Sequence, residues 1–409
     1  MSNDALYAAL EVAVADLGVR LARDPEPHNA AQHLHAASQP VEAILKKYPI
    51  LPTDPQRMVN QGNGTLGLHY STFDKLLVTV AVERGPQDAV TWMEKILTLK
   101  SADIRCVALL TGVSTAGAIS LGHGVDILPV DQLPSSQKTS GMLSLCMQPT
   151  SRWFGLQPSA ALISTVTVCP FLVEARPARR LTSPKSSDDR LAPAEWYAAF
   201  NAQEKMKEVC LALTLSSNAG PTIALQWNEF VDSDLAFFPT GFFWPSDEIA
   251  SAAFSPAEEI RTEALPATQA YLAMHGSNRD RFDLALRRLN QAARRRDVGD
   301  IILDLAIAIE GLLAGEESGE ISYRFALRAA LILGTDSSER REIRKCMKEF
   351  YSYRSKMVHS GSIKEKDQPA ALRIANKSTT YIRQILTKLI LHGSIPKDWG
   401  DLEIGAATI

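Results

Sequence analysis

The sequence predicts an α+β N-terminal region, helical at its start and then mixed in strands and helices, followed by an all-α bundle of five helices. Short apolar runs separated by Gly and Asp, between residues 102 and 227, predict the strands. After residue 279, apolar residues recur at helical spacing in five segments joined by short turns, which is typical of antiparallel helices in a bundle. The 409 residues are enough for two or three domains.

The composition is that of an ordinary soluble globular protein, with 45% hydrophobic and 22% charged residues. There is no run of about 18 apolar residues, so we expect no contact with a membrane. The N-terminus lacks the basic and apolar regions of a secretory signal. The five cysteines are scattered and never form a Cys-x-x-Cys pair, which predicts reduced thiols in a cytoplasmic protein without a zinc site. No Gly-rich phosphate loop is found, and we expect neither a metal nor a cofactor.

Charge is distributed unevenly along the chain. The net charge of the whole is −3, but residues 279–395 hold 22 Lys and Arg against 15 Asp and Glu, a balance of +7. The rest of the chain therefore carries −10. Such an asymmetry arises from solvated helix faces, or it marks a local field that attracts a polyanion.

Residues 1–100 are predicted to be mainly helical. Apolar residues at helical spacing predict helices over Asp4–Ala22, Ala30–Lys47 and Ser71–Leu99, the last with a break at Gly85-Pro86. Between them, Leu51–Gly67 is rich in Pro, Asn and Gly and is predicted to be a loop.

Residues 101–276 are predicted to form an α+β region with a sensor or regulatory role. The predicted strands are Cys106–Leu110, Ala118–Leu121, Val125–Val130, Ala160–Cys169, Glu208–Leu215 and Thr222–Trp227. The predicted loops are Pro134–Pro158 and Arg176–Pro193. The aromatic stretch Phe237–Trp244 is typical of a core edge, although base stacking is an alternative. A capping Ser255 before Pro256 predicts a helix that runs to about Met274.

Residues 277–395 are predicted to form the bundle, and residues 396–409 a tail. The expected helices are Asp280–Arg296, Val298–Leu313, Ile321–Leu333, a helix capped by Asp336 that runs to Val358, and Gln368–Leu391. The fourth helix ends with Arg354 and His359, which have four residues between them, just before Gly361. Arginine fixes a phosphate and is always charged, whereas histidine can move a proton near neutral pH.

These residues resemble those of a known family. Arg354-Ser355-Lys356-Met357-Val358-His359 matches the Arg-x4–6-His signature of HEPN domains. The apolar Val298–Leu313, with its Ile-Glu-Gly-Leu-Leu end, is similar to the Apea-like branch of that superfamily. The resemblance covers residues 279–395, under a third of the chain.

The resemblance implies a metal-independent endoribonuclease that acts as a defence or toxin effector on RNA. It implies Arg354 and His359 as catalytic residues, and products with a 2′,3′-cyclic phosphate and a 5′-OH. Members of the family commonly dimerise, so we expect a homodimer through the bundle with a composite site. Two residues five apart on a helix lie about 140° apart around its axis, which one chain alone does not bring together. Control is expected from the N-terminal region, through a protein or phage-derived trigger.

Three residues are predicted to support the site. Ser355 occupies a position where the family often has Asn, Asp or His, and can donate a hydrogen bond to phosphate. Glu310 either orients Arg354 or His359, or pairs structurally with an arginine such as Arg324. Tyr353 either lines the cleft or packs in the core.

Two other functions compete with a ribonuclease. In the first, the bundle only dimerises and binds RNA or a nucleotide, and the N-terminal region binds a protein. The second, a metal-dependent hydrolase that uses the N-terminal histidines, is poorly supported because His33 and His35 would point in different directions on a helix.

Overall fold

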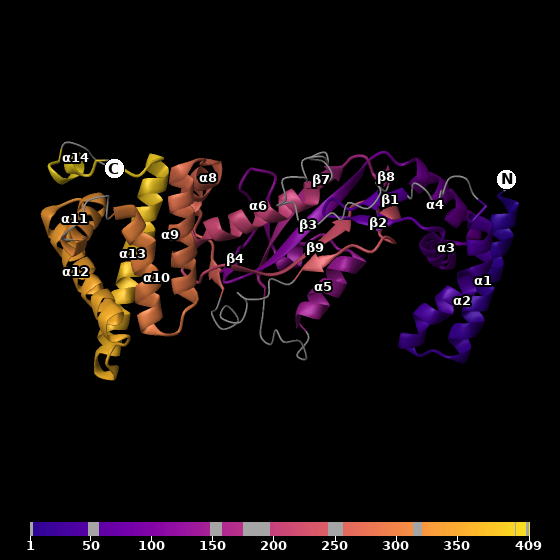
Figure 1. Ribbon diagram of the computed structural model, residues 1–409, viewed down its shortest axis with the longest axis horizontal. Helices are drawn as coiled ribbons and strands as arrows, with labels where there is room; N and C mark the ends of the chain where they lie inside the picture. The colour runs from indigo at the N-terminus through magenta and orange to yellow at the C-terminus, as the bar shows by residue number, and fades with distance from the viewer. Residues whose placement is uncertain are drawn as a thin grey trace. The chain divides into compact units, whose positions relative to one another are not determined.

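The computed structural model describes residues 3–47, 57–147, 158–174, 197–243, 257–313, 321–396, 398–405 and 409 (Figure 1). They form a mixed α+β architecture with a helical C-terminal part, which confirms that part of the prediction. The chain is divided into two compact units, each of which is made of three segments of the sequence. Unit 1 comprises Met1–Cys106, Ser164–Gln203 and Trp227–Phe242, and unit 2 comprises Val107–Ile163, Glu204–Gln226 and Phe243–Ile409.

Four helices pack on one another in unit 1. They are α1 (Asp4–Arg23), α2 (Ala30–Leu45), α3 (Tyr70–Arg84) and α4 (Pro86–Thr98). The predicted break between the last two is confirmed: Gly85 has a φ of +95°, where glycine avoids the strain of a side chain, and Pro86 begins α4. Leu6, Leu10 and Leu17 of α1 are buried, as the helical spacing predicts.

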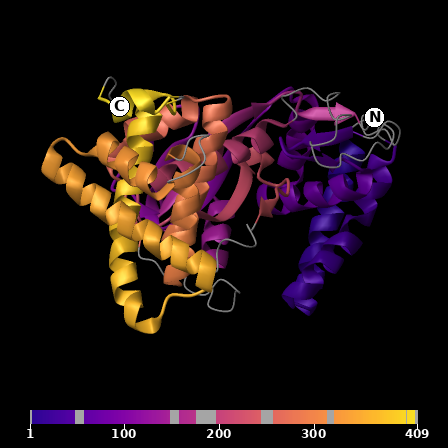
Figure 2. The same cartoon turned by 60° about the vertical axis from the view of Figure 1, so that its left-hand side comes forward.

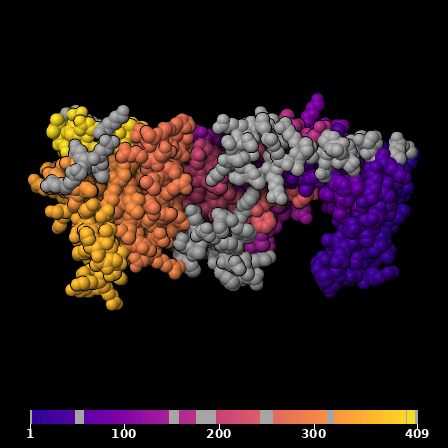
Figure 3. Space-filling model, in the orientation of Figure 1, coloured from indigo at the N-terminus to yellow at the C-terminus, as the bar shows by residue number. Residues whose placement is uncertain are grey.

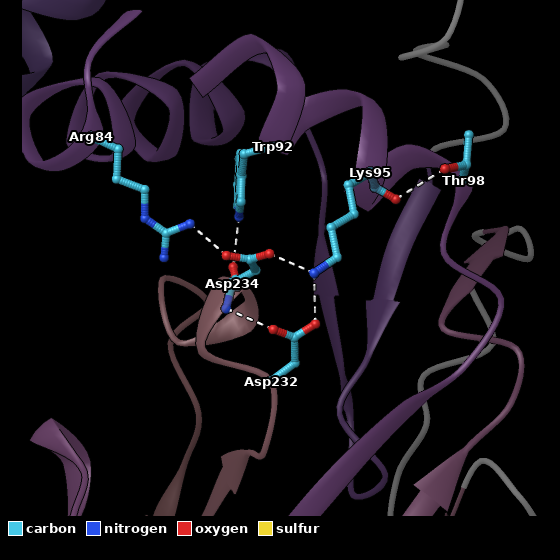
Figure 4. A network of polar contacts seen from close by, with 6 residues as sticks. All are labelled: Arg84, Trp92, Lys95, Thr98, Asp232 and Asp234. Atoms are coloured by element: carbon cyan, nitrogen blue, oxygen red, sulfur yellow. Dashed lines mark hydrogen bonds and ion pairs between the residues drawn. The ribbon is translucent and has the colours of Figure 1, made fainter. Parts of the chain in front are cut away.

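A polar network fixes the turn after strand β9 (Thr222–Phe230) to α3 and α4. Asp234 lies between Arg84 and Lys95 and forms an ion pair with each (Figure 4). Lys95 also contacts Asp232 at 2.9 Å, and the Trp92 indole donates a 2.6 Å hydrogen bond to the Asp234 carbonyl. The hydrogen bonds from Lys95 and Arg84 hold the pKa of the Asp234 carboxyl below its usual value.

The first two rings of the aromatic stretch, Phe237 and Phe238, pack against other rings, whereas Phe242 is 43% exposed. Phe238 is 2% exposed, and its ring lies 5.8 Å from that of Trp92 and 6.1 Å from that of Phe171. Phe237 packs edge-on against Trp92, under the guanidinium of Arg84. Trp244, at the end of the predicted stretch, lies outside the described residues.

Two larger sheets and a two-stranded one accompany the helices in the described part of the chain. A three-stranded antiparallel sheet has the order β2-β1-β8, with β1 at Arg57–Asn60, β2 at Thr65–Gly67 and β8 at Leu172–Glu174. A six-stranded sheet has the order β10-β9-β3-β7-β6-β5. Its strands are β10 (Phe242–Phe243), β9 (Thr222–Phe230), β3 (Ala102–Thr111), β7 (Ala160–Val168), β6 (Asp126–Pro129) and β5 (Ile119–Ser120). Every residue of β9 is buried.

The predicted loop over Leu51–Gly67 is wrong in its described part, because residues 57–67 form the β1–β2 hairpin. The Gly and Asn residues that suggested a loop make the hairpin turn, where the Gln61 amide donates to the Gly64 carbonyl. The predicted loop over Pro134–Pro158 contains helix α5 (Gln137–Met147), and residues 148–157 lie outside the described part. The predicted loop Arg176–Pro193 also lies outside it.

The predicted strand Glu208–Leu215 is wrong, since it is the end of α6 (Ala198–Ala212) and a 3-10 turn. A short apolar run of this kind does not distinguish a strand from a buried helix. The predicted helix to Met274 begins later than its capping signal. Residues 258–259 form β11, which pairs in parallel with β4 (Val113–Ser114), and helix α8 spans Leu265–Ala273.

The C-terminal part of unit 2 holds the five expected helices. They are α9 (Ser277–Arg294), α10 (Val298–Leu313), α11 (Ile321–Leu333), α12 (Ser337–Ser360) and α13 (Gln368–His392). Helix α10 packs against α9, α12 and α13, and α11 packs against α12 and α13. Helices α12 and α13 pack on each other, and in Figure 2 the orange α12 crosses the yellow α13 (Figure 1, Figure 2). The orange and yellow atoms of this helical part lie together in the space-filling view (Figure 3).

Buried charges fix these helices in place. Asp304 of α10, 4% exposed, accepts from Arg288 at 2.9 Å and from Arg295 at 3.0 Å. Arg383 of α13 is also 4% exposed and donates to the Thr214 carbonyl at 3.1 Å and to Asn218. Burial lowers the pKa of Arg383 to about 10.

The predicted tail is folded in part. Residues Gly400–Glu403 form helix α14, which packs on α11. Glu403 accepts a 2.8 Å bond from the buried Arg328, whose guanidinium also lies over the Trp399 ring. Among the described helices, none has the length and apolar character needed to cross a bilayer.

We predict that Asp234→Asn lowers the stability of the protein at pH 7 by roughly 1 kcal/mol, as expected for partly buried ion pairs. The folded-state pKa of Asp234 is lowered, so its stabilisation is present above the unfolded value of about 3.9 and is lost as the pH falls through the folded value. The difference in melting temperature between the wild type and the variant, measured from pH 7 to pH 3, should therefore shrink towards zero at low pH. A difference that stays constant across this pH range would contradict the role given to the Asp234 carboxylate. The matched control is Asp232→Asn, which removes one ion pair instead of two and should destabilise the protein less.

Candidate functional site

Helix α12 carries both predicted catalytic residues. It is α-helical from Ser337 to Ser360 and begins at Asp336, whose carboxylate accepts from the amides of the first turn. It ends at Gly361 with a φ of +70°, a left-handed cap that glycine adopts at little cost. Along such a helix, Arg354 and His359 are about 7.5 Å apart in rise and about 140° apart around the axis. The two side chains of one chain therefore leave α12 in different directions.

Arg354 is held by two contacts on different helices. Its Nε lies 3.0 Å from Oε1 of Glu310 on α10 as an ion pair, and its Nη2 donates a 3.2 Å hydrogen bond to Oε2. Its guanidinium carbon lies 5.3 Å from the centre of the Tyr351 ring, a cation–π distance. The guanidinium is thus held by one hydrogen bond and one ion-pair contact to the same carboxylate, while about a quarter of its side chain stays exposed.

Glu310 contacts Arg354, one of the two residues that the sequence analysis expected it to orient. This requires α10 to face α12, and the two helices do pack together. The Glu310 side chain is 24% exposed, so the pair remains accessible to water and to an incoming anion.

His359 lies in the last turn of α12 and is exposed. Within the described part of the chain, no group forms a hydrogen bond or an ion pair with its imidazole. The ring is therefore accessible to a molecule that binds at the end of α12.

The two other residues near the site differ in exposure. Tyr353 is 8% exposed and packs in the core, where burial raises the pKa of its phenol. Ser355 is half-buried and lines an open hollow of about 610 Å³ on the surface of α12. The hollow is bordered by Ser322 of α11 and by Lys345, Lys348, Glu349, Tyr351, Ser352 and Ser355 of α12.

Tyr351 lies between this hollow and Arg354 and contacts both. Its ring lines the hollow, contacts Arg354, and packs 5.9 Å from the ring of Phe325. Burial raises the pKa of the Tyr351 phenol, and the nearby Arg354 partly opposes that shift. The sequence analysis did not assign a role to Lys345 or Lys348, although their spacing from Ser352 and Ser355 already placed all four on one helix face.

The site thus has two parts. Glu310, Arg354 and Tyr351 form one cluster, and His359 stands apart from it at the helix end. A fixed guanidinium stabilises negative charge that develops on a phosphoryl oxygen, and an exposed imidazole can act as acid or base. Among the described residues, no three His, Cys, Asp or Glu side chains gather as metal ligands would.

Comparison of the chain with protein-family models, with curated proteins and with solved structures found no match.

We predict that Glu310 and Arg354 are energetically coupled. A double-mutant cycle of Glu310→Ala, Arg354→Ala and the double variant, measured by urea unfolding, should give a coupling of about 0.5–1 kcal/mol, the upper range for a pair with this exposure. The exposed pair Lys377–Glu342, which also joins two helices, is the control and should give less. Coupling indistinguishable from zero at Glu310–Arg354 would show that Glu310 does not fix the arginine.

Proposed function

We propose that this chain is a metal-independent endoribonuclease of the HEPN type, with Arg354 and His359 as its catalytic residues. The observation that supports the proposal is the contact that holds Arg354 and the exposure of His359. Arg354 is oriented by Glu310 from a neighbouring helix, and His359 is exposed and unengaged at the end of the same α12. In this proposal, residues 277–395 form the five-helix HEPN bundle, of the Apea-like branch.

The reaction needs only the RNA and these side chains. The 2′-OH of one nucleotide attacks the adjacent phosphorus, and a base accepts its proton. The P–O5′ bond then breaks, and an acid gives a proton to the leaving 5′-oxygen. His359 fills either proton-transfer role, and Arg354 stabilises the additional negative charge of the phosphorane. The products are a 2′,3′-cyclic phosphate and a 5′-OH.

The geometry of α12 favours a site built by two chains. Arg354 and His359 of one helix diverge by about 140°, and one imidazole has to serve two proton transfers. Two α12 ends that meet across a homodimer would place two guanidinium groups and two imidazoles in one cleft. Ser355, half-buried beside Arg354, would donate a hydrogen bond to phosphate there.

The remaining part of the chain would control the nuclease. A free ribonuclease harms the cell that makes it, so the proposal gives residues 1–276 a regulatory role in a defence or toxin effector. A protein or phage-derived trigger would release the activity on cytoplasmic RNA.

One observation favours a second function, a non-catalytic module that dimerises and binds RNA or a nucleotide. Arg354 is already neutralised by Glu310, so a phosphate gains less from binding it than from a free guanidinium. The position next to it is Ser355, where the family often has Asn, Asp or His.

We predict that the wild type cleaves single-stranded RNA and transfer RNA in EDTA, and that Arg354→Ala and His359→Ala each lower the rate at least a hundredfold, a usual loss for a removed acid–base or electrostatic group. Gel analysis of the RNA measures the cleavage rates, and mapping of the RNA ends identifies the products. Lys356→Ala, on the same exposed segment of α12, is the control and should retain activity. Equal rates in all variants would refute the site. Binding without cleavage, with or without phage-infected lysate as trigger, would favour the second function.

We predict that the two inactive variants complement each other. A mixed dimer of Arg354→Ala with His359→Ala keeps one intact Arg354 and one intact His359 in the shared cleft. Mixing the variants, with brief warming to exchange subunits, should therefore restore a measurable part of the wild-type rate. Mixtures as inactive as the separate variants, with exchange shown by differently tagged chains, would place the complete site within one chain.

A further inference from the structure

A row of polar side chains follows one face of α12 towards His359. Its members are Lys345, Lys348, Ser352, Ser355 and His359, at alternating spacings of three and four residues. With about 100° per residue, all five lie within about 80° around the helix axis, and they extend over about 21 Å. We refer to these five residues as the α12 strip.

The strip is accessible and its positive charges are unpaired. Lys345, Lys348, Ser352 and His359 are exposed, and Ser355 is half-buried. Within the described part of the chain, neither lysine has an ion pair. The first four residues of the strip line the hollow of about 610 Å³, so the surface is concave where the lysines and hydroxyl groups meet.

The strip adjoins both parts of the proposed catalytic site. His359 is its last member, and Tyr351, which lines the same hollow, contacts Arg354. A chain that lies in the hollow therefore passes Tyr351 on one side and continues along the strip to His359.

We propose that the α12 strip binds the backbone of single-stranded RNA and leads it to His359. Lys345 and Lys348 contact successive phosphates, and the hydroxyl groups of Ser352 and Ser355 donate hydrogen bonds to phosphate oxygens between the lysines and the imidazole. This inference rests on the proposed function, because it assigns these residues as positioning groups for that substrate.

The chemistry of the strip fits a nucleic-acid backbone better than a protein. Protein interfaces have an apolar and aromatic centre, and the strip contains no apolar residue. A backbone of regularly spaced phosphates instead needs cations and hydroxyl donors in a row, and single-strand sites of about 4–16 nucleotides use such grooves. Tyr351, at the edge of the hollow, offers an aromatic ring beside the row.

Glu349 provides an internal control of opposite sign. Its carboxylate lines the same hollow, four residues after Lys345, and forms no ion pair with it. A phosphate in the hollow would be repelled by Glu349, so removal of this charge should strengthen binding if the hollow holds RNA.

The test measures binding separately from cleavage. Full-length wild type and Lys345→Gln/Lys348→Gln are titrated into a labelled single-stranded RNA with 2′-O-methyl groups, which lacks the attacking hydroxyl, and anisotropy is followed from about 50 to 300 mM salt. We expect the double variant to bind about tenfold more weakly at the lowest salt. The slope of log K against log salt should fall by about 1.4, or about 0.7 for each lost phosphate contact. Glu349→Gln should bind more tightly than wild type.

The control is Lys205→Gln/Lys207→Gln on α6, which removes the same charge elsewhere in unit 2. Equal losses in the two double variants would overturn the proposal, because the effect would then come from net charge alone. Wild-type affinity in Lys345→Gln/Lys348→Gln, or absence of binding by the wild type, would also overturn it. Because the RNA is not cleavable, strip-dependent binding without cleavage of ordinary RNA would refute the proposed function and leave the strip in place.

Discussion

The periodicity of α12 is the constraint on which the rest of the site depends. The helix stays α-helical through its last turn, so residues 354 and 359 point about 140° apart. Arg354 consequently faces α10 and Glu310, whereas His359 belongs to the solvent face with Ser352 and Ser355. Neither position can be moved without unwinding the end of the helix, where Gly361 sets the stop. A reaction that needs a guanidinium and an imidazole at the same phosphate therefore requires a second α12, from another chain, beside the first.

The Glu310–Arg354 pair sets the electrostatics of the site. A carboxylate next to a guanidinium orients it and reduces its entropy loss on binding, but it also competes with a phosphate for the same nitrogens. Because the pair is only about three-quarters covered, water still screens it, and the competition costs less than it would in a dry core. Lys345 and Lys348, which form no ion pair within the described part of the chain, add two positive charges to the hollow that also holds Glu349.

Sequence reasoning predicted the helical C-terminal part well because strong periodicity and caps agreed there. Asp336 caps the start of α12 and Gly361 its end, as expected, and Gly85-Pro86 separates α3 from α4. It failed where short apolar runs were ambiguous, as at Glu208–Leu215, and where turn-rich composition hid the β1–β2 hairpin. At the site, the spacing gave the divergence of Arg354 and His359. The choice of Arg354 as the partner of Glu310 depends on how α10 packs on α12, which no local pattern encodes.

The most direct test of the account is the dependence of specific ribonuclease activity on protein concentration, measured beside the dimer fraction from analytical ultracentrifugation. If Arg354 and His359 act only across two chains, specific activity rises in proportion to the dimer fraction and vanishes on dilution to monomer. Ribonuclease activity that stays constant per chain under conditions where the protein is monomeric, and that still requires both residues, would contradict it.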